Sequence, residues 1–160
     1  TPMLLSAFVI DYKLQIIPNR LNMTMFEIGI ILMFLAGVFN ANIAIDMFLG
    51  MLVGSGIFLF ITLVGGLIAG KEAMGFGDVK LMGALGIFFG LTNTVAITLM
   101  SFLIGAVLSI LLLATRIKKT DEYIPFGPFI VIAAFIAMVV PFNTILSALL
   151  FVFSLGMIKI

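Results

Sequence analysis

Residues 81–115 form a long, uncharged and mostly apolar stretch, LMGALGIFFGLTNTVAITLMSFLIGAVLSILLLAT. About 20 apolar residues are enough for one helix to cross the hydrocarbon core of a bilayer, so this stretch is too long for a single crossing. The polar tripeptide Thr92-Asn93-Thr94 interrupts it near its middle. We therefore predict a hairpin of two membrane helices that are joined at residues 92–94.

Other uncharged stretches extend the same pattern. They cover residues 28–45, 47–70 and 123–158, and Pro141-Phe142-Asn143 breaks the last of them near its middle. Continuous apolarity of this length is typical of membrane helices and differs from the alternating pattern of barrel strands. The predicted segments are residues 24–39, 45–69, 78–91, 95–115, 126–140 and 144–158.

Residues 2–10 form a shorter apolar segment, which Asp11 follows at once. As a helix this segment would span roughly 14 Å, about half of the hydrocarbon core. We therefore expect an all-α, polytopic membrane helix bundle with six full transmembrane segments and a partial or truncated first helix.

The composition of the 160-residue chain supports a membrane domain. Hydrophobic residues make up 64% of it and charged residues 9%, whereas soluble domains carry about 25% charged residues. Eight Lys and Arg against seven Asp and Glu give a net charge of +1. This balance excludes a nucleic-acid binder, which needs clustered cations. We expect one membrane-embedded domain over residues 1–160, in contact with the lipid bilayer and without a soluble domain.

The absence of Cys and His from the sequence limits the available chemistry. It excludes Cys/His zinc sites, Cys nucleophiles, Ser-His-Asp triads and haem ligation by His. The side chains left for proton transfer are those of Asp, Glu, Lys and Tyr. We expect no metal and no bound cofactor.

The cations predict the orientation of the chain. They are Lys13, Arg20, Lys71, Lys80, Arg116, Lys118, Lys119 and Lys159. With the predicted segments, all of them fall on one side of the membrane, and the loops of the other side contain none. Because Lys and Arg are retained on the cytoplasmic side, we expect the N-terminus outside and the C-terminus in the cytoplasm.

Local patterns explain some polar residues and glycines as structural. Thr24 and Glu27 fit a capping box, and Asp46 fits the N-cap of the next predicted helix. Glycines spaced four residues apart allow helices to approach closely. The pairs are Gly50 with Gly54, Gly66 with Gly70, and Gly86 with Gly90.

Asp11 and Asp78 remain, and the predicted topology puts both at the cytoplasmic boundary of the membrane. Carboxylates beside hydrocarbon are costly and usually mark proton or substrate sites. Two of them could share one proton, so that the ionised one activates a water and the protonated one donates to a substrate carbonyl. Gly75 and Gly77 lack a Cβ and would let an extended peptide backbone approach Asp78. The structural alternative is that Asp78 only caps its helix and that the two glycines only form a turn.

Three stretches, taken together and in this order, resemble the motifs of one family. DYKLQIIPNRLN, residues 11–22, places Pro18 and Asn19 a short spacer after Asp11. GFGDVKLMGALG covers residues 75–86, and YIPFGPF covers residues 123–129. Together they resemble the first aspartate region, the GxGD signature and a late Pro/Gly-rich segment of the type IV prepilin peptidases, which are aspartic membrane proteases.

The resemblance implies an aspartic endopeptidase of the bacterial cytoplasmic, or inner, membrane. Such enzymes remove the short basic leader of type IV prepilins and related pseudopilins, of type IV pili or type II secretion, at the cytoplasmic face. By motif match, Asp11 and Asp78 would be the catalytic pair. Many relatives also carry a Cys-rich zinc extension and methylate the new N-terminus with S-adenosylmethionine. This chain has no Cys, so methyltransferase activity is doubtful for it.

Other residues near the motifs are candidates for supporting roles. Glu72, Asp121 and Glu122 would attract the basic leader, although exposed ion pairs are individually weak. Lys80 would either favour an ionised Asp78 or extend its charged end to the membrane surface. Pro18 and Asn19 are candidates because they belong to the first motif.

Alternative functions stay open on the residues alone. One is a GxGD intramembrane protease of broader specificity, and another is a proton-coupled transporter that uses Asp11, Asp78 and Asp46 as a relay. A relay needs acids along the depth of the membrane, whereas the two motif acids share one predicted boundary and Asp46 lies at the other. A catalytically inactive scaffold is a third alternative. The sequence does not specify the particular prepilin or the oligomeric state.

Overall fold

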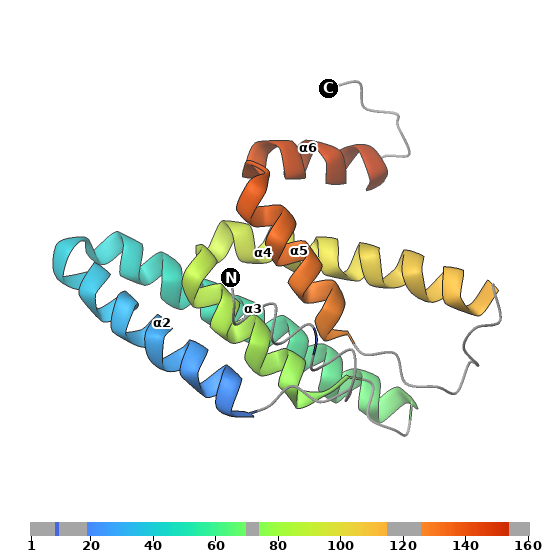
Figure 1. The fold of residues 1–160 in the computed structure, drawn as a ribbon, viewed down its shortest axis with the longest axis horizontal. Helices are drawn as coiled ribbons and strands as arrows, with labels where there is room; N and C mark the ends of the chain where they lie inside the picture. Colours follow the sequence, from blue (N-terminus) through green and yellow to red (C-terminus); the bar gives the residue numbers. More distant parts are fainter. Residues whose placement is uncertain (1–8, 10–18, 70–73, 115–125, 154–160) are drawn as a thin grey trace.

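The computed structural model describes Val9 and residues 19–69, 74–114 and 126–153. Every regular element in these ranges is an α-helix (Figure 1). The helices are α2 (Asn19–Phe39), α3 (Ala41–Ala69), α4 (Phe76–Ala114), α5 (Gly127–Val139) and α6 (Phe142–Phe153). The predicted all-α class is confirmed for this part of the chain.

Among the described helices, three are long and apolar enough to cross a membrane. The qualifying parts are Arg20–Phe39, Ala41–Ile68 and Phe76–Leu111, and α5 is a shorter apolar helix. Large apolar side chains such as Phe34 and Phe60 are exposed on these helices. Together these properties indicate a multi-pass membrane protein. The count of six full segments and the orientation of the termini stay predictions.

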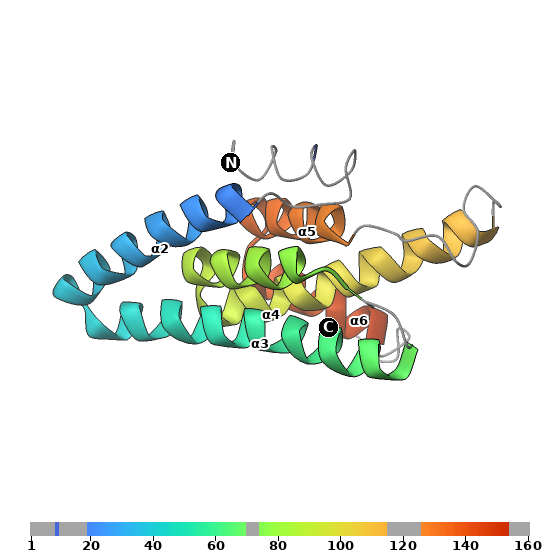
Figure 2. The same cartoon turned by 90° about the horizontal axis from the view of Figure 1, so that it is seen from below.

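The chain reverses direction inside α4 at Gly90, whose φ of 71° and ψ of 178° are not helical. In Figures 1 and 2 the two halves of α4 run in opposite directions on either side of this bend. The hairpin predicted for residues 81–115 is therefore confirmed, but its bend lies just before the predicted position, residues 92–94. Glycine reaches a positive φ without the cost that a Cβ imposes. Asn93 and Thr94 instead stay helical and donate hydrogen bonds to carbonyls of the preceding turn.

Asp46 stabilises this bend and is not the N-cap of its own helix, so that prediction is wrong. α3 begins at Ala41, and Asn40 caps it because its Oδ1 accepts the N–H of Asn42 at 3.0 Å. Asp46 lies further along α3, where its Oδ1 accepts the N–H of Leu91 at 3.2 Å. The carboxylate thus caps the second half of α4 from a neighbouring helix.

The predicted capping box at Thr24 and Glu27 is also wrong. α2 begins at Asn19, so Thr24 lies inside the helix, where its Oγ1 donates to the carbonyl of Arg20 at 2.8 Å. A hydroxyl in this position bonds to the preceding turn and does not cap free N–H groups. Glu27 is exposed further along the same helix.

Glycines bring the backbones of α3 and α4 into direct contact. A Cβ on Gly50 or on Gly86 would overlap the carbonyl oxygen of the other, and a Cβ on Gly54 would lie 2.9 Å from the carbonyl oxygen of Met82. The close approach predicted from the pairs at residues 50–54 and 86–90 is therefore confirmed. Gly70, from the third pair, lies outside the described residues.

Phenylalanine rings join α3, the second half of α4 and the start of α5. Phe58 stacks on Phe102 with ring centroids 5.4 Å apart, and Phe126 lies 5.1 Å from Phe102 and 5.7 Å from Phe129. A Cβ on Gly105 would lie 3.0 Å from the rings of Phe126 and Phe129, so the glycine makes room for them. The described part of the third motif therefore packs the start of α5 against α4.

The ends of α2, α3 and α4 fall into two groups along the long axis of the molecule. The connection from α2 to α3 and the bend at Gly90 lie toward the left end in Figures 1 and 2. The starts of α2 and α4 lie away from that end. Arg20 and Lys80 are near these starts, whereas Asp46 is bonded to the bend.

Gly50→Ala should destabilise the fold, because the new Cβ would overlap the backbone of α4 at Gly86. Overpacking of this kind lowers the free energy of unfolding by about 1–3 kcal/mol. Gly56→Ala is the matched control on the same helix, because a Cβ there meets nothing within 4 Å and Ala favours a helix. Thermal unfolding in detergent, followed by circular dichroism, compares the two. A Gly50→Ala protein as stable as the wild type would contradict the backbone contact.

Asp46→Ala should lower the free energy of unfolding by about 0.5–2 kcal/mol, the usual effect of losing a helix cap. Asp46→Asn keeps an Oδ1 that can accept the N–H of Leu91, so it should lose less stability. Denaturant unfolding of both variants in the same detergent measures the difference. Equal losses in the two variants would show that the hydrogen bond to Leu91 does not stabilise the bend.

Candidate active site

Asp78 lies in the first turn of α4 and is buried, with 3% of its surface exposed. Its N–H donates to the carbonyl of Gly75 at 3.0 Å and closes the turn from which the helix starts. Free N–H groups at a helix start favour a negative charge nearby. The carboxylate is therefore held at the start of a helix, where most solvent is excluded.

The glycines before Asp78 occupy two different positions. Gly75 precedes the first residue of α4, Phe76, while Gly77 is already helical, and both glycines are half-buried. Asp78 is thus a first-turn residue and not the N-cap that the structural alternative assigned to it. A first-turn carboxylate still complements the helix dipole, so its position alone does not exclude a structural role.

Asn22 of α2 is a polar residue at this place that the sequence analysis missed. Its side chain is 1% exposed, and its Nδ2 donates to the carbonyl of Gly77 at 3.1 Å. Its Oδ1 is buried and has no hydrogen-bond donor among the residues that the structure describes. The sequence contains one signal for this role, because Asn22 is an amide residue in the first motif next to an apolar stretch. Burying an amide in such a place without a hydrogen-bond partner is costly.

A cavity of about 400 Å³ opens between α2 and α4 next to this hydrogen bond. Met23, Phe26 and Ile30 provide apolar walls, and Asn22, Glu27 and Lys80 provide polar ones. Lys80 is exposed two residues after Asp78. The cavity therefore combines an apolar surface with both signs of charge close to the start of α4.

Several predicted site residues cannot be placed. Asn19 is the first residue of α2, but the other residues of this group lie outside the described ranges: Asp11, Pro18, Glu72, Asp121 and Glu122. The pairing of Asp11 with Asp78 and the attraction of a basic leader by the loop acids therefore stay predictions.

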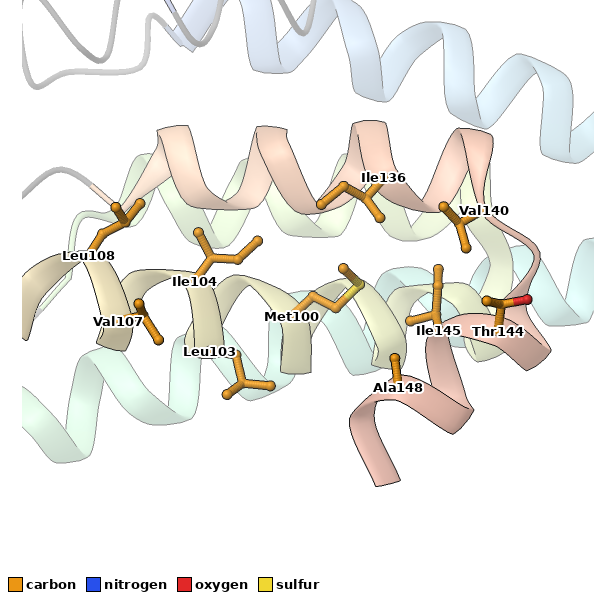
Figure 3. A pocket seen from close by; sticks show the side chains of 10 residues that line it. All are labelled: Met100, Leu103, Ile104, Val107, Leu108, Ile136, Val140, Thr144, Ile145 and Ala148. Atoms are coloured by element: carbon orange, nitrogen blue, oxygen red, sulfur yellow. The ribbon is translucent and has the colours of Figure 1, made fainter. Parts of the chain in front are cut away.

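A larger cavity, of about 610 Å³, lies between the second half of α4, α5 and α6. Figure 3 shows side chains such as Met100, Ile136 and Ile145 around this space, with Thr144 as a polar residue at its side. Among the residues that the structure describes, no ionisable side chain lines it. The cavity near Asn22 is consequently the better candidate for chemistry.

The described ranges contain no cluster of three His, Cys, Asp or Glu residues that could hold a metal ion. Their acids are Glu27, Asp46 and Asp78, of which Asp46 is bonded to Leu91. Asp78 is the buried one.

Comparison with known proteins connects these features to one family. Residues 1–110 match the model of the type IV leader peptidase family. This range contains both predicted aspartates, the GxGD stretch and Asn22. No solved structure matches the chain.

Curated relatives carry the name prepilin leader peptidase/N-methyltransferase. The protein from Aeromonas hydrophila is 31% identical over 138 residues, which cover 86% of this chain and 47% of the relative. The protein from Legionella pneumophila is 34% identical over 137 residues, which cover 84% of this chain and 46% of the relative. A shorter match to the Pseudomonas aeruginosa protein is 42% identical over 72 residues, which cover 45% of this chain and 25% of the relative. The chain thus spans about half the length of the first two relatives.

Proposed function

The chain belongs to the type IV leader peptidase family, and on this premise we propose that it is a membrane aspartic endopeptidase. Its substrates are type IV prepilins or pseudopilins, from which it removes the leader peptide. The observation that carries the proposal is the burial of Asp78 in the first turn of α4. Ionisable side chains buried within a membrane domain are costly, and they commonly mark a substrate or proton site.

In the proposed mechanism, Asp11 and Asp78 hold one proton between them. The ionised carboxylate takes a proton from a water molecule, whose oxygen attacks the scissile carbonyl carbon, while the protonated carboxyl group donates to the carbonyl oxygen. The tetrahedral intermediate then collapses and the C–N bond breaks. The leaving amine takes the proton that the first carboxylate had removed from water, and a hydroxyl of the new carboxyl group returns a proton to the second, which restores the shared proton. Because the two carboxyl groups share a proton, their titration belongs to the pair.

The proposal places the reaction at the cytoplasmic face of the inner membrane. Arg20 and Lys80 near the starts of α2 and α4 support this orientation, because cations are retained on the cytoplasmic side. With seven segments, the six full ones and the first partial one, the N-terminus would lie outside and the C-terminus in the cytoplasm. The exposed apolar side chains of the long helices would then contact lipid.

The hydrogen bond of Asp46 argues against a proton-coupled transporter. In a relay, Asp46 would have to exchange protons with the other acids across the membrane. It instead caps the second half of α4 through the N–H of Leu91, a role that a charged, stationary carboxylate serves best. A GxGD protease of broader specificity would use the same acids, and the two are distinguished by comparing a prepilin peptide with unrelated membrane peptides.

Asp11→Asn and Asp78→Asn should each reduce cleavage of a prepilin-like peptide by at least about 100-fold, the usual contribution of general acid–base catalysis. Asn keeps the shape of the side chain but cannot hold the shared proton. The matched control is Asp46→Asn, which should cleave at the wild-type rate. Cleavage is followed by mass spectrometry in lipid nanodiscs, and folding by circular dichroism. Substantial turnover by either motif variant would refute the catalytic pair.

Neutralising the loop acids should weaken binding of the basic leader. In the triple variant Glu72→Gln, Asp121→Asn, Glu122→Gln, we expect a higher KM at low salt and the same kcat, because exposed charges act mainly on encounter. At high salt the difference should vanish, since ions screen the attraction. A KM equal to that of the wild type at low salt would rule out this role.

A further inference from the structure

The side-chain amide of Asn22 is held in one orientation. Its Nδ2 donates to the carbonyl of Gly77, and a flipped amide would instead place two acceptors, Oδ1 and the carbonyl oxygen, against each other. The Oδ1 must therefore point away from Gly77. This oxygen is buried and lacks a donor among the described residues.

A buried acceptor without a donor destabilises a protein, and where a native structure keeps one, a water molecule or a role in binding or catalysis accounts for it. The donor that would satisfy Oδ1 must be an N–H or an O–H group. Asn22 lines the cavity between α2 and α4, so a molecule that enters there lies beside this amide, and its donor reaches the covered oxygen once the atoms over it shift. The cavity, at about 400 Å³, is far larger than the roughly 30 Å³ of a water molecule.

We propose that Asn22 is a substrate-binding residue whose Oδ1 accepts a backbone N–H of the peptide substrate. The peptide lies extended in the cavity between α2 and α4, so that Asn22 bonds to the substrate and to Gly77 at the same time. This inference rests on the proposed peptidase function.

The position of the hydrogen bond favours a peptide next to its scissile bond. Gly77 is followed directly by Asp78, so the amide of Asn22 is attached to the peptide unit that carries the proposed catalytic carboxylate. Gly75 and Gly77 have no Cβ to keep a second backbone away. The apolar walls of Met23 and Phe26 would cover the side chains of an apolar substrate segment.

Ester substitution tests this hydrogen bond, because an ester replaces the backbone N–H by an oxygen. A prepilin-like peptide is made with one ester at a time, at each position flanking the scissile bond. Its Kd is measured by fluorescence anisotropy with the full chain in nanodiscs. The Asp78→Asn background prevents turnover during the measurement.

With Asn22 present, one ester position should weaken binding about tenfold, the effect of one buried hydrogen bond. With Asn22→Ala the same ester should have no effect, because the acceptor is gone. Asn22→Asp keeps an acceptor but loses the donor to Gly77, so the penalty of the ester should persist. If Asn22 only fixed the start of α4, Asn22→Ala and Asn22→Asp would both weaken binding of the all-amide peptide. Each ester would then change the Kd by the same factor in the variants as with Asn22 present.

The outcomes separate this inference from the proposed function. Equal ester penalties with and without Asn22 overturn the substrate hydrogen bond, even when the wild type cleaves the all-amide peptide. One ester that weakens binding only when Asn22 is present, together with no cleavage by the wild type, refutes the peptidase proposal and supports a peptide-binding site. Peptides that do not bind at all refute both.

Discussion

The backbone contact between Gly50 of α3 and Gly86 of α4 is the constraint on which the rest of the structure depends. It exists only because neither residue has a Cβ. Asp46 and Gly90 each lie one turn from this contact on the same helix faces. The contact therefore brings the carboxylate to the bend, where it accepts the N–H of Leu91. Gly90 leaves space for the carboxylate, because a Cβ there would overlap it.

The bend decides where the second half of α4 runs and what can pack on it. That half carries Phe102 and Gly105, against which Phe126 and Phe129 of the third motif pack. The first half is fixed between neighbours by fully buried side chains such as Leu81. Because Asp78 is in its first turn, the candidate site is supported by the most enclosed helix segment among the described residues. A site on such rigid elements keeps its geometry better than one on a loop.

The two wrong capping predictions, for Thr24 and Asp46, have one cause. Capping rules predict the roles of Thr24 and Asp46 from partners at the start of the same helix. Thr24 instead lies inside α2 and bonds to the carbonyl of Arg20. Asp46 accepts the N–H of Leu91, which is 45 positions away in the sequence, and so caps the second half of α4. The hairpin within residues 81–115 was predictable, because its length exceeds one crossing, but its bend was assigned to polar residues and not to glycine. Local patterns contain no information on partners that only folding brings together.

By itself, the sequence determined the helical membrane class, the family through its ordered motifs, the close glycine contacts and Asp78 as a candidate catalytic residue. The helical class and the glycine contacts follow from composition and spacing, whereas the family follows from the resemblance of the three motifs to those of known proteins. Only the tertiary structure decided that Asp46 caps the bend at Gly90, and that Asn22 holds the backbone of Gly77 while its Oδ1 lacks a described donor. The physical reason is that a hydrogen bond between two helices depends on how their backbones are placed relative to each other. Glycines permit a close approach here, but the order of residues does not specify which groups then meet.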